Sequence, residues 1–117
     1  NLDLLAKTIS MLHPIQGPPI LAPAYDMVPW IVQPTDGRLA MSVNGVYRLD
    51  ELTVVDLVAE GLAWGVRDAN QIVAETLDGV LVATSDEAPH PRAHPDLRAR
   101  IEANTRRILA AAPLPEH

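Results

Sequence analysis

The sequence predicts a mainly α fold, in which a short β-hairpin region at the N-terminal end packs on about three helices. Apolar residues recur at helical spacing in the second half of the chain, whereas residues 1–52 alternate short apolar runs with Pro and Gly turns. With 117 residues, 48% of them hydrophobic and 21% charged, the chain has the length and composition of one soluble globular domain. It contains no Phe, two Trp and two Tyr, which predicts a thin core because aromatic side chains bury the most area.

The first elements are expected to form a two-stranded ribbon. Thr8 to His13 is rich in β-branched and apolar residues, and Pro14 to Pro19 is a turn in which Gly17 can adopt a positive φ. Ile20 to Ala22 would be the return strand, which ends at Pro23. Because an isolated ribbon is only marginally stable in water, we expect it to pack on the rest of the domain.

A second hairpin is predicted further along the chain. The Asp36-Gly37 turn precedes an extended run from Arg38 to Val43. Asn44-Gly45 is a strong two-residue hairpin turn, and Val46 to Arg48 would form the return strand. Residues 49–52 then lead into the first helix.

Two helices are expected between residues 53 and 84. Thr53 is a good N-cap, and Trp64-Gly65 ends the first helix with a glycine. Asp68 is expected to cap the second helix, which runs to about Thr84. The residues that recur at helical spacing are Leu57, Val58, Leu62 and Ala63 in the first helix, and those that form the apolar stripe of the second are Ile72, Val73, Thr76, Leu77 and Val80.

A Pro-rich linker, 85–95, separates these helices from a terminal helix, 96–112. The side chains expected to face inward from the terminal helix are those of Leu97, Ile101, Ile108 and Leu109. The four arginines Arg98, Arg100, Arg106 and Arg107 are expected to point outward as a solvated face, with a contact to a missing lobe or an acidic partner as the second interpretation.

Charge and composition exclude several classes of function. A net charge of −6 argues against direct nucleic-acid binding, which needs clustered Lys and Arg. The absence of Cys excludes disulfides and thiolate metal sites. No apolar run approaches the roughly 18 residues of a membrane span, so a soluble cytoplasmic protein is expected. The chain begins at Asn1 within a candidate motif, and we expect it to be a fragment of a longer protein.

Two further groups of residues have structural interpretations. His90 and His94 have the spacing of helix-borne zinc ligands, but Pro89 and Pro91 rule out a regular helix there, so they are expected to be linker residues. The aromatic residues expected to anchor the core are Trp30, Tyr47 and Trp64.

Two carboxylates flank the expected ribbon. Asp3 precedes the ribbon and Asp26 follows it, each where an apolar run meets a loop. Because a hairpin brings its two ends together, this arrangement is suited to holding a metal-bound phosphate. Protein kinases place a catalytic Asp five positions before an Asn, and a second Asp after a short hairpin binds Mg²⁺. Here Thr8 stands five positions after Asp3.

Three segments together resemble HipA-like serine/threonine protein kinases. Asn1-Leu2-Asp3-Leu4-Leu5-Ala6-Lys7-Thr8 resembles the Asn-x-Asp-x-His-x-Lys-Asn catalytic loop of that family. Leu21-Ala22-Pro23-Ala24-Tyr25-Asp26-Met27-Val28-Pro29 resembles its Leu-x-Pro-x-Tyr-Asp metal-binding segment, and Leu39-Ala40-Met41-Ser42-Val43-Asn44-Gly45 the Leu-Ala-Leu-x-Ile-x-Gly run that follows. The resemblance covers roughly the first two-thirds of the chain, in the family's order and spacing.

The resemblance implies that the chain is part of a kinase-like C-terminal lobe, with residues 1–52 as the catalytic-loop and metal-binding hairpin region. Asp3 would be the catalytic base, Asp26 and Thr8 Mg²⁺ ligands, and Lys7 and Thr8 residues near the ATP phosphates. The implied cofactors are Mg²⁺ and ATP. Known members are toxins of toxin–antitoxin pairs. They phosphorylate an aminoacyl-tRNA synthetase and are restrained by a DNA-binding antitoxin.

The chain departs from the family pattern at two positions, because Thr8 replaces the Asn and Leu5 replaces the His. A Thr hydroxyl can ligate Mg²⁺ but lacks the reach of an amide oxygen. The Gly-rich loop and the ATP-contacting Lys belong to an N-terminal lobe that is missing here, so the fragment alone is expected to be inactive. Two alternatives remain open: a catalytically degenerate binding or regulatory module, and an unrelated helical interaction domain.

Overall fold

The computed structural model describes residues 2, 4, 9–25, 27, 30–32 and 34–110. Within these residues the chain is mainly α with two antiparallel strand pairs, as predicted. The helices are α1 (Val54–Ala63), α2 (Ala69–Asp86) and α3 (Leu97–Ala110). The strands are β1 (Met11–Leu12), β2 (Ile20–Leu21), β3 (Arg38–Val43) and β4 (Val46–Arg48), and two 3₁₀ turns, η2 (Trp30–Val32) and η3 (Leu49–Glu51), are additional to the predicted elements.

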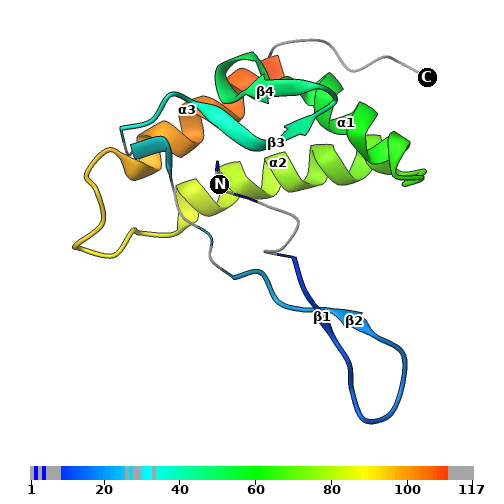
Figure 1. Cartoon of the computed structure of the whole chain (residues 1–117). Helices are drawn as coiled ribbons and strands as arrows, with labels where there is room; N and C mark the ends of the chain where they lie inside the picture. Colours follow the sequence, from blue (N-terminus) through cyan, green and yellow to red (C-terminus); the bar gives the residue numbers. More distant parts are fainter. Residues whose placement is uncertain are drawn as a thin grey trace.

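The helices and the second hairpin form one packed body. Helix α2 contacts both α1 and α3, and β3 contacts α1. Figure 1 shows the β3–β4 hairpin lying over the helices, while the β1–β2 ribbon projects away from them. None of the helices in the described ranges has the length and apolar character that a membrane crossing requires.

The core is small, as the shortage of aromatic residues predicts. Its centre consists of Val54, Leu77 and Ile108, one residue from each helix, and Val54 is fully buried. Leu57, Val73 and Leu109 pack around this centre and are only partly buried. Two of the aromatic residues predicted as core anchors are not in the core, since Tyr47 is 46% exposed and Trp64 is 73% exposed. The side chain of Trp30 lies outside the described part of the structure.

The β3–β4 hairpin has the bounds that the sequence predicts. Its turn residues Asn44 and Gly45 have φ values of 51° and 77°, which is the double positive φ of a tight hairpin turn. The turn is also fastened to α1. The Asn44 backbone N–H donates to Glu60 Oε2 at 2.8 Å, and Asn44 Nδ2 donates to Asp56 Oδ1 at 3.0 Å. These bonds fix the hairpin against the first helix.

Helix α1 begins with the predicted Thr53 cap. The Thr53 hydroxyl accepts from the Asp56 N–H, and Asp56 Oδ2 accepts from both the N–H and the hydroxyl of Thr53, so the two residues form a capping box. The helix ends at Trp64 and Gly65, whose φ of 84° is the left-handed conformation expected after a helix C-terminus.

Helix α2 begins where the sequence predicts, with Asp68 at the N-cap position, although the Asp68 side chain makes no capping hydrogen bond. The helix continues to Asp86, two residues beyond the predicted end near Thr84. Its predicted apolar stripe is only partly correct, because Leu77 is buried but Ile72 is 49% exposed. In α1, Leu62 belongs to the apolar residues at helical spacing but is 55% exposed.

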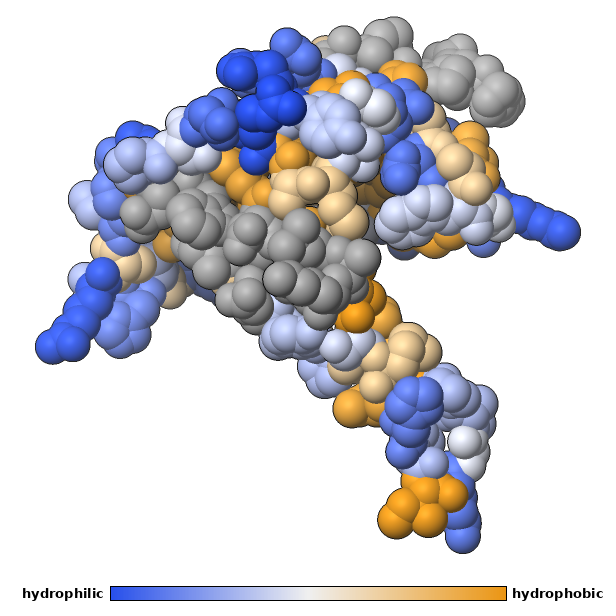
Figure 2. Space-filling view, in the orientation of Figure 1, coloured by the Kyte–Doolittle hydropathy of each residue, from blue (hydrophilic) through white to orange (hydrophobic). Residues whose placement is uncertain are grey.

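The β1–β2 ribbon is shorter than predicted, with two residues in each strand. Met11 pairs with Leu21 and Leu12 pairs with Ile20. All four side chains are exposed, so the expectation that the ribbon packs on the rest of the domain is wrong for these residues. Figure 2 shows hydrophobic atoms along the projecting ribbon and at its far end.

Candidate functional site

The residues to which the sequence assigns chemistry lie outside the described part of the structure. These are Asp3, the predicted base, and Lys7, Thr8 and Asp26, the predicted phosphate and Mg²⁺ residues. Leu5, one of the two departures from the family pattern, also lies outside it. The geometry of the site must therefore be built from the described residues that flank these positions.

Hydrogen bonds join the two strand segments at the base of the ribbon, beside the predicted motifs. We call this base, formed by Ser10, Ala22 and Tyr25, the neck of the ribbon. The Ala22 N–H donates to the Ser10 carbonyl at 2.8 Å, and the hydroxyls of Ser10 and Tyr25 lie 2.8 Å apart in a hydrogen bond. Ser10 follows Thr8 by two positions, and Tyr25 immediately precedes Asp26. The two chain segments that lead to the predicted site are thus joined at this neck.

A second contact joins the first and third motif segments. Leu2 lies beside Asp3 in the sequence, and its carbonyl accepts a hydrogen bond of 2.8 Å from the N–H of Ala40 in β3. The Leu2 side chain is buried, with 8% of it exposed. This contact could not be read from the sequence, because nothing local to either segment specifies the pairing.

Leu2 also lines an apolar groove of about 380 Å³ in the packed body. Its walls come from β3, α1 and the first half of α2. The lining residues used in the arguments below are Leu39, Met41, Glu60, Trp64 and Ile72. Leu39 and Met41 belong to the third motif segment, so the groove runs along one of the three segments on which the resemblance rests.

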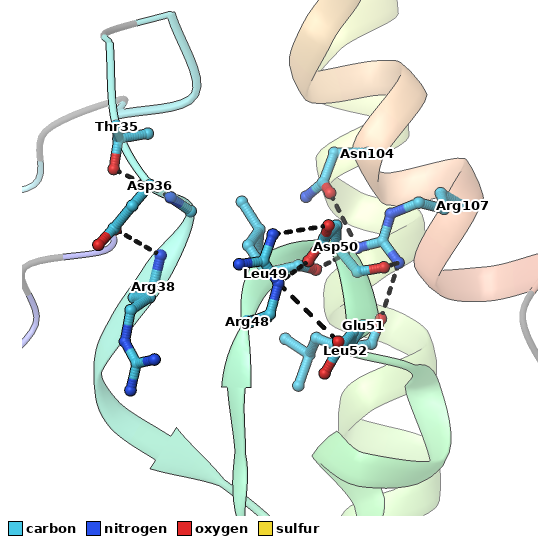
Figure 3. A network of polar contacts seen from close by, with 11 residues as sticks. Thr35, Asp36, Arg38, Arg48, Leu49, Asp50, Glu51, Leu52, Asn104 and Arg107 are labelled. Carbon is cyan, nitrogen blue, oxygen red and sulfur yellow. Dashed lines mark hydrogen bonds and ion pairs between the residues drawn. The ribbon is translucent and has the colours of Figure 1, made fainter.

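The third feature is a polar network centred on Arg107, drawn in Figure 3. Arg107 Nη2 donates to the Leu49 carbonyl at 2.6 Å, and Nη1 donates to the carbonyls of Asp50 and Leu52 at 3.1 and 3.0 Å. Asn104 Oδ1 accepts a further bond from Nη2 at 3.1 Å. The prediction that Arg107 points into solvent is therefore wrong, because its guanidinium supplies donors to the carbonyls around η3.

Two other arginines of α3 also donate hydrogen bonds to backbone carbonyls. Arg100 donates to the Ile31 carbonyl at 3.0 Å, and Arg98 donates to the carbonyls of Thr84 and Ser85. Two of the four arginines also make exposed ion pairs, Arg106 with Glu102 and Arg100 with Asp96. Spacing offered a signal for two of these residues: Arg100 and Arg107 stand seven positions apart, two helical turns, and so share one side of α3.

A polar hollow of about 290 Å³ lies beside the Arg107 network, lined in part by Asp36, Arg48 and Asp50. Arg48 donates to both carboxylate oxygens of Asp50, at 3.0 and 3.1 Å. The hydrogen bond from Arg48 lowers the pKa of Asp50. Since both charges are exposed and paired with each other, the hollow presents no unpaired charge from these two residues to a ligand.

The described residues hold no metal site. They contain no group of three or more His, Asp or Glu side chains placed to bind an ion. His90 and His94 behave as linker residues, as predicted. His90 Nδ1 accepts from the Arg92 N–H, and His94 Nδ1 accepts from the Asp96 N–H, each at 3.1 Å.

Comparison of the chain with protein-family models, with curated proteins and with solved structures finds no match.

Proposed function

We propose that this chain is the C-terminal-lobe segment of a HipA-like serine/threonine kinase. The observation that supports the proposal best is the closed neck of the ribbon. A kinase of this type needs its catalytic loop and its metal-binding Asp at the two ends of one short hairpin. The Ser10–Tyr25 hydrogen bond joins two segments that continue, within two residues, into Thr8 and Asp26.

The proposed roles follow from the chemistry of each side chain. The Asp3 carboxylate accepts the proton of a Ser or Thr hydroxyl as that oxygen attacks the γ-phosphorus of ATP and the bond to the bridging oxygen of ADP breaks. Asp26 and Thr8 offer oxygen ligands, which suit Mg²⁺, and Lys7 offers a positive charge to the phosphates. Bound Mg²⁺ supplies charge neutralisation at the phosphates.

The remaining parts of the proposal concern the N-terminal lobe and the binding partners. In the family, the N-terminal lobe carries the Gly-rich loop and an ATP-contacting Lys, so we propose that the present chain by itself transfers no phosphate. By the resemblance, the protein substrate is an aminoacyl-tRNA synthetase and the restraining partner is a DNA-binding antitoxin.

The test uses the whole protein in an autophosphorylation assay with radiolabelled ATP. Replacing Asp3 by Ala removes the base, and we expect a loss of at least about a hundredfold in rate. Asp36→Ala is a matched control, because Asp36 lies in the turn before β3, outside the proposed site, where its carboxylate accepts a hydrogen bond from the Arg38 N–H. Full activity of Asp3→Ala would contradict the proposed base.

The alternative is a catalytically degenerate member that acts as a binding or regulatory module. The substitution of Thr8 for the family's Asn, together with Leu5 for its His, favours this alternative. Thr8→Asn separates the two. An active kinase gains or keeps activity with the amide ligand, whereas a degenerate module stays inactive while still binding its partner. Micromolar Mg-ATP binding by the fragment alone, measured by calorimetry, would contradict the claim that it is inactive.

A further inference from the structure

The β1–β2 ribbon presents an apolar surface that carries no formal charge. Residues 9–25 contain no Asp, Glu, Lys or Arg, although the whole chain has a net charge of −6. Ile15, at the turn, is completely exposed, and Leu21 is 66% exposed. Figures 1 and 2 show this ribbon projecting from the helices with hydrophobic atoms at its far end. Apolar surface gathered in this way marks an interaction site.

The edges of the ribbon are poorly suited to pairing with another strand, so a partner would contact its faces. Each strand has only two residues, and Pro14, Pro18, Pro19 and Pro23 follow or precede the strands closely. Proline has no N–H to give to a neighbouring strand, so it blocks continuation of a sheet. A partner must therefore contact the apolar side chains.

The apolar groove on the packed body offers matching chemistry. Among the described residues that line it, Glu60 is the only charged one. Both of its carboxylate oxygens already accept hydrogen bonds, Oε2 from the Asn44 N–H and Oε1 from Trp64 Nε1. These donors are neutral, so Glu60 keeps its negative charge, and the groove disfavours an acidic occupant. It favours an uncharged, apolar segment.

We propose that the ribbon of one copy docks in the groove of a second copy. Two copies of an acidic chain repel each other, and a segment without carboxylates can approach with the least like-charge repulsion. The ribbon is such a segment, and its Ile and Leu side chains suit the Leu, Met and Ile walls of the groove. Reciprocal exchange of the two ribbons closes a two-fold dimer with two equal contacts.

This proposal does not need the kinase assignment. The kinase assignment rests on Asp3, Thr8 and Asp26 and on the Ser10–Tyr25 bond at the base of the ribbon, whereas the dimer rests on the exposed apolar side chains of the ribbon and on the groove. A failure of either leaves the other standing.

The first experiment is equilibrium sedimentation of the full chain over a concentration series reaching about 1 mM. We expect a monomer–dimer equilibrium. Ile15→Asp in the ribbon and Ile72→Lys in the groove should each raise the dissociation constant about tenfold or more, because each places a charge in an apolar contact. Ile15 is fully exposed and Ile72 is half-exposed, so neither change disturbs the core. Val55→Asp, on an exposed position of α1 outside the groove, is the matched control and should leave the dissociation constant unchanged.

The second experiment mixes the two weakened variants in equal amounts. The Ile72→Lys copy keeps a native ribbon, and the Ile15→Asp copy keeps a native groove, so these two surfaces can form one native contact. In the other contact, the introduced Asp of one copy meets the introduced Lys of the other. The mixed dimer should be tighter than either variant alone.

Three results would overturn the proposal. They are a wild-type chain that is monomeric over the whole series, a dimer that neither substitution weakens, and a mixture that associates no better than its components.

Discussion

Arg107 lies in the last turn of α3, and its guanidinium reaches three backbone carbonyls that belong to the segment before α1. These carbonyls, of Leu49, Asp50 and Leu52, surround η3, where the chain turns from β4 into the first helix. The planar guanidinium can serve several acceptors at once because its five donors are fixed in a fork. One side chain thereby joins the C-terminal helix to the end of the second hairpin.

Arg107→Met should lower the free energy of unfolding by about 2 kcal/mol, because the partly buried carbonyls lose charge-assisted donors. Arg106→Met is the matched control. Arg106 is exposed and pairs with Glu102 as its one partner among the described residues, so its replacement should leave stability nearly unchanged. Urea unfolding followed by circular dichroism measures both values. Equal effects of the two substitutions would show that the Arg107 bonds do not stabilise the fold.

At the scale of elements, the contact between α1 and α2 depends on a glycine. A Cβ placed on Gly61 would lie 2.9 Å from the Cβ of Ala69, closer than real Cβ contacts come. Ala69 is the first residue of α2 and is almost completely buried, so it has little room to move away. Gly61 therefore permits the close approach of α2 to the last turns of α1.

Gly61→Ala should lower the free energy of unfolding by about 1 kcal/mol, because the clash outweighs the better helix propensity of Ala. The same substitution at Gly79 should raise it by up to about 1 kcal/mol, because a Cβ there meets nothing within 4 Å. Thermal unfolding of the two variants should move the midpoint in opposite directions. A rise for both would mean that the helices separate without cost.

For the whole molecule, the carboxylates connect stability to pH. Asp56 belongs to the capping box of α1 and also holds the Asn44 turn. Burial alone would raise its pKa, but the hydrogen bonds from Asn44 and Thr53 outweigh burial and leave the pKa below the ordinary value. The pKa of Asp50 is lowered as well, by the hydrogen bond from Arg48. Both groups bind fewer protons in the folded chain than in the unfolded chain.

The contribution of a group with a lowered folded pKa is present above its unfolded pKa, about 3.9, and disappears as the pH falls through the folded value. The free energy of unfolding should therefore be nearly constant with respect to Asp56 from pH 7 to pH 5 and fall in more acid solution. Asp56→Asn should cost about 1 kcal/mol at pH 7 and progressively less below pH 4, whereas Asp78→Asn on the exposed side of α2 serves as control. A constant difference between wild type and Asp56→Asn down to pH 2 would exclude this linkage.

The sequence alone determined the elements whose signals are local. The β3–β4 hairpin has its predicted bounds because Asn44-Gly45 accepts two positive φ angles with little strain, and α1 begins at Thr53 because Thr and Asp satisfy each other across one turn. The β-branched and apolar runs and the Pro and Gly turn between them predicted the position of the ribbon correctly, though not the length of its strands. For the candidate site, sequence supplied the motif residues and nothing about their geometry, since Asp3, Lys7, Thr8 and Asp26 lie outside the described residues.

The tertiary structure alone decided which surfaces meet. Spacing groups Arg107 with Arg100 on one side of α3, but it does not show that Arg107 binds the carbonyls around η3, because that segment lies more than fifty positions away in the sequence. The pairing of Leu2 with Ala40 and the exposure of Tyr47, Trp64 and the ribbon are likewise long-range outcomes. The periodicity of apolar residues shows which side of an element is apolar, whereas burial of that side requires a partner surface. The packed body of this chain covers only part of the apolar surface of the described residues.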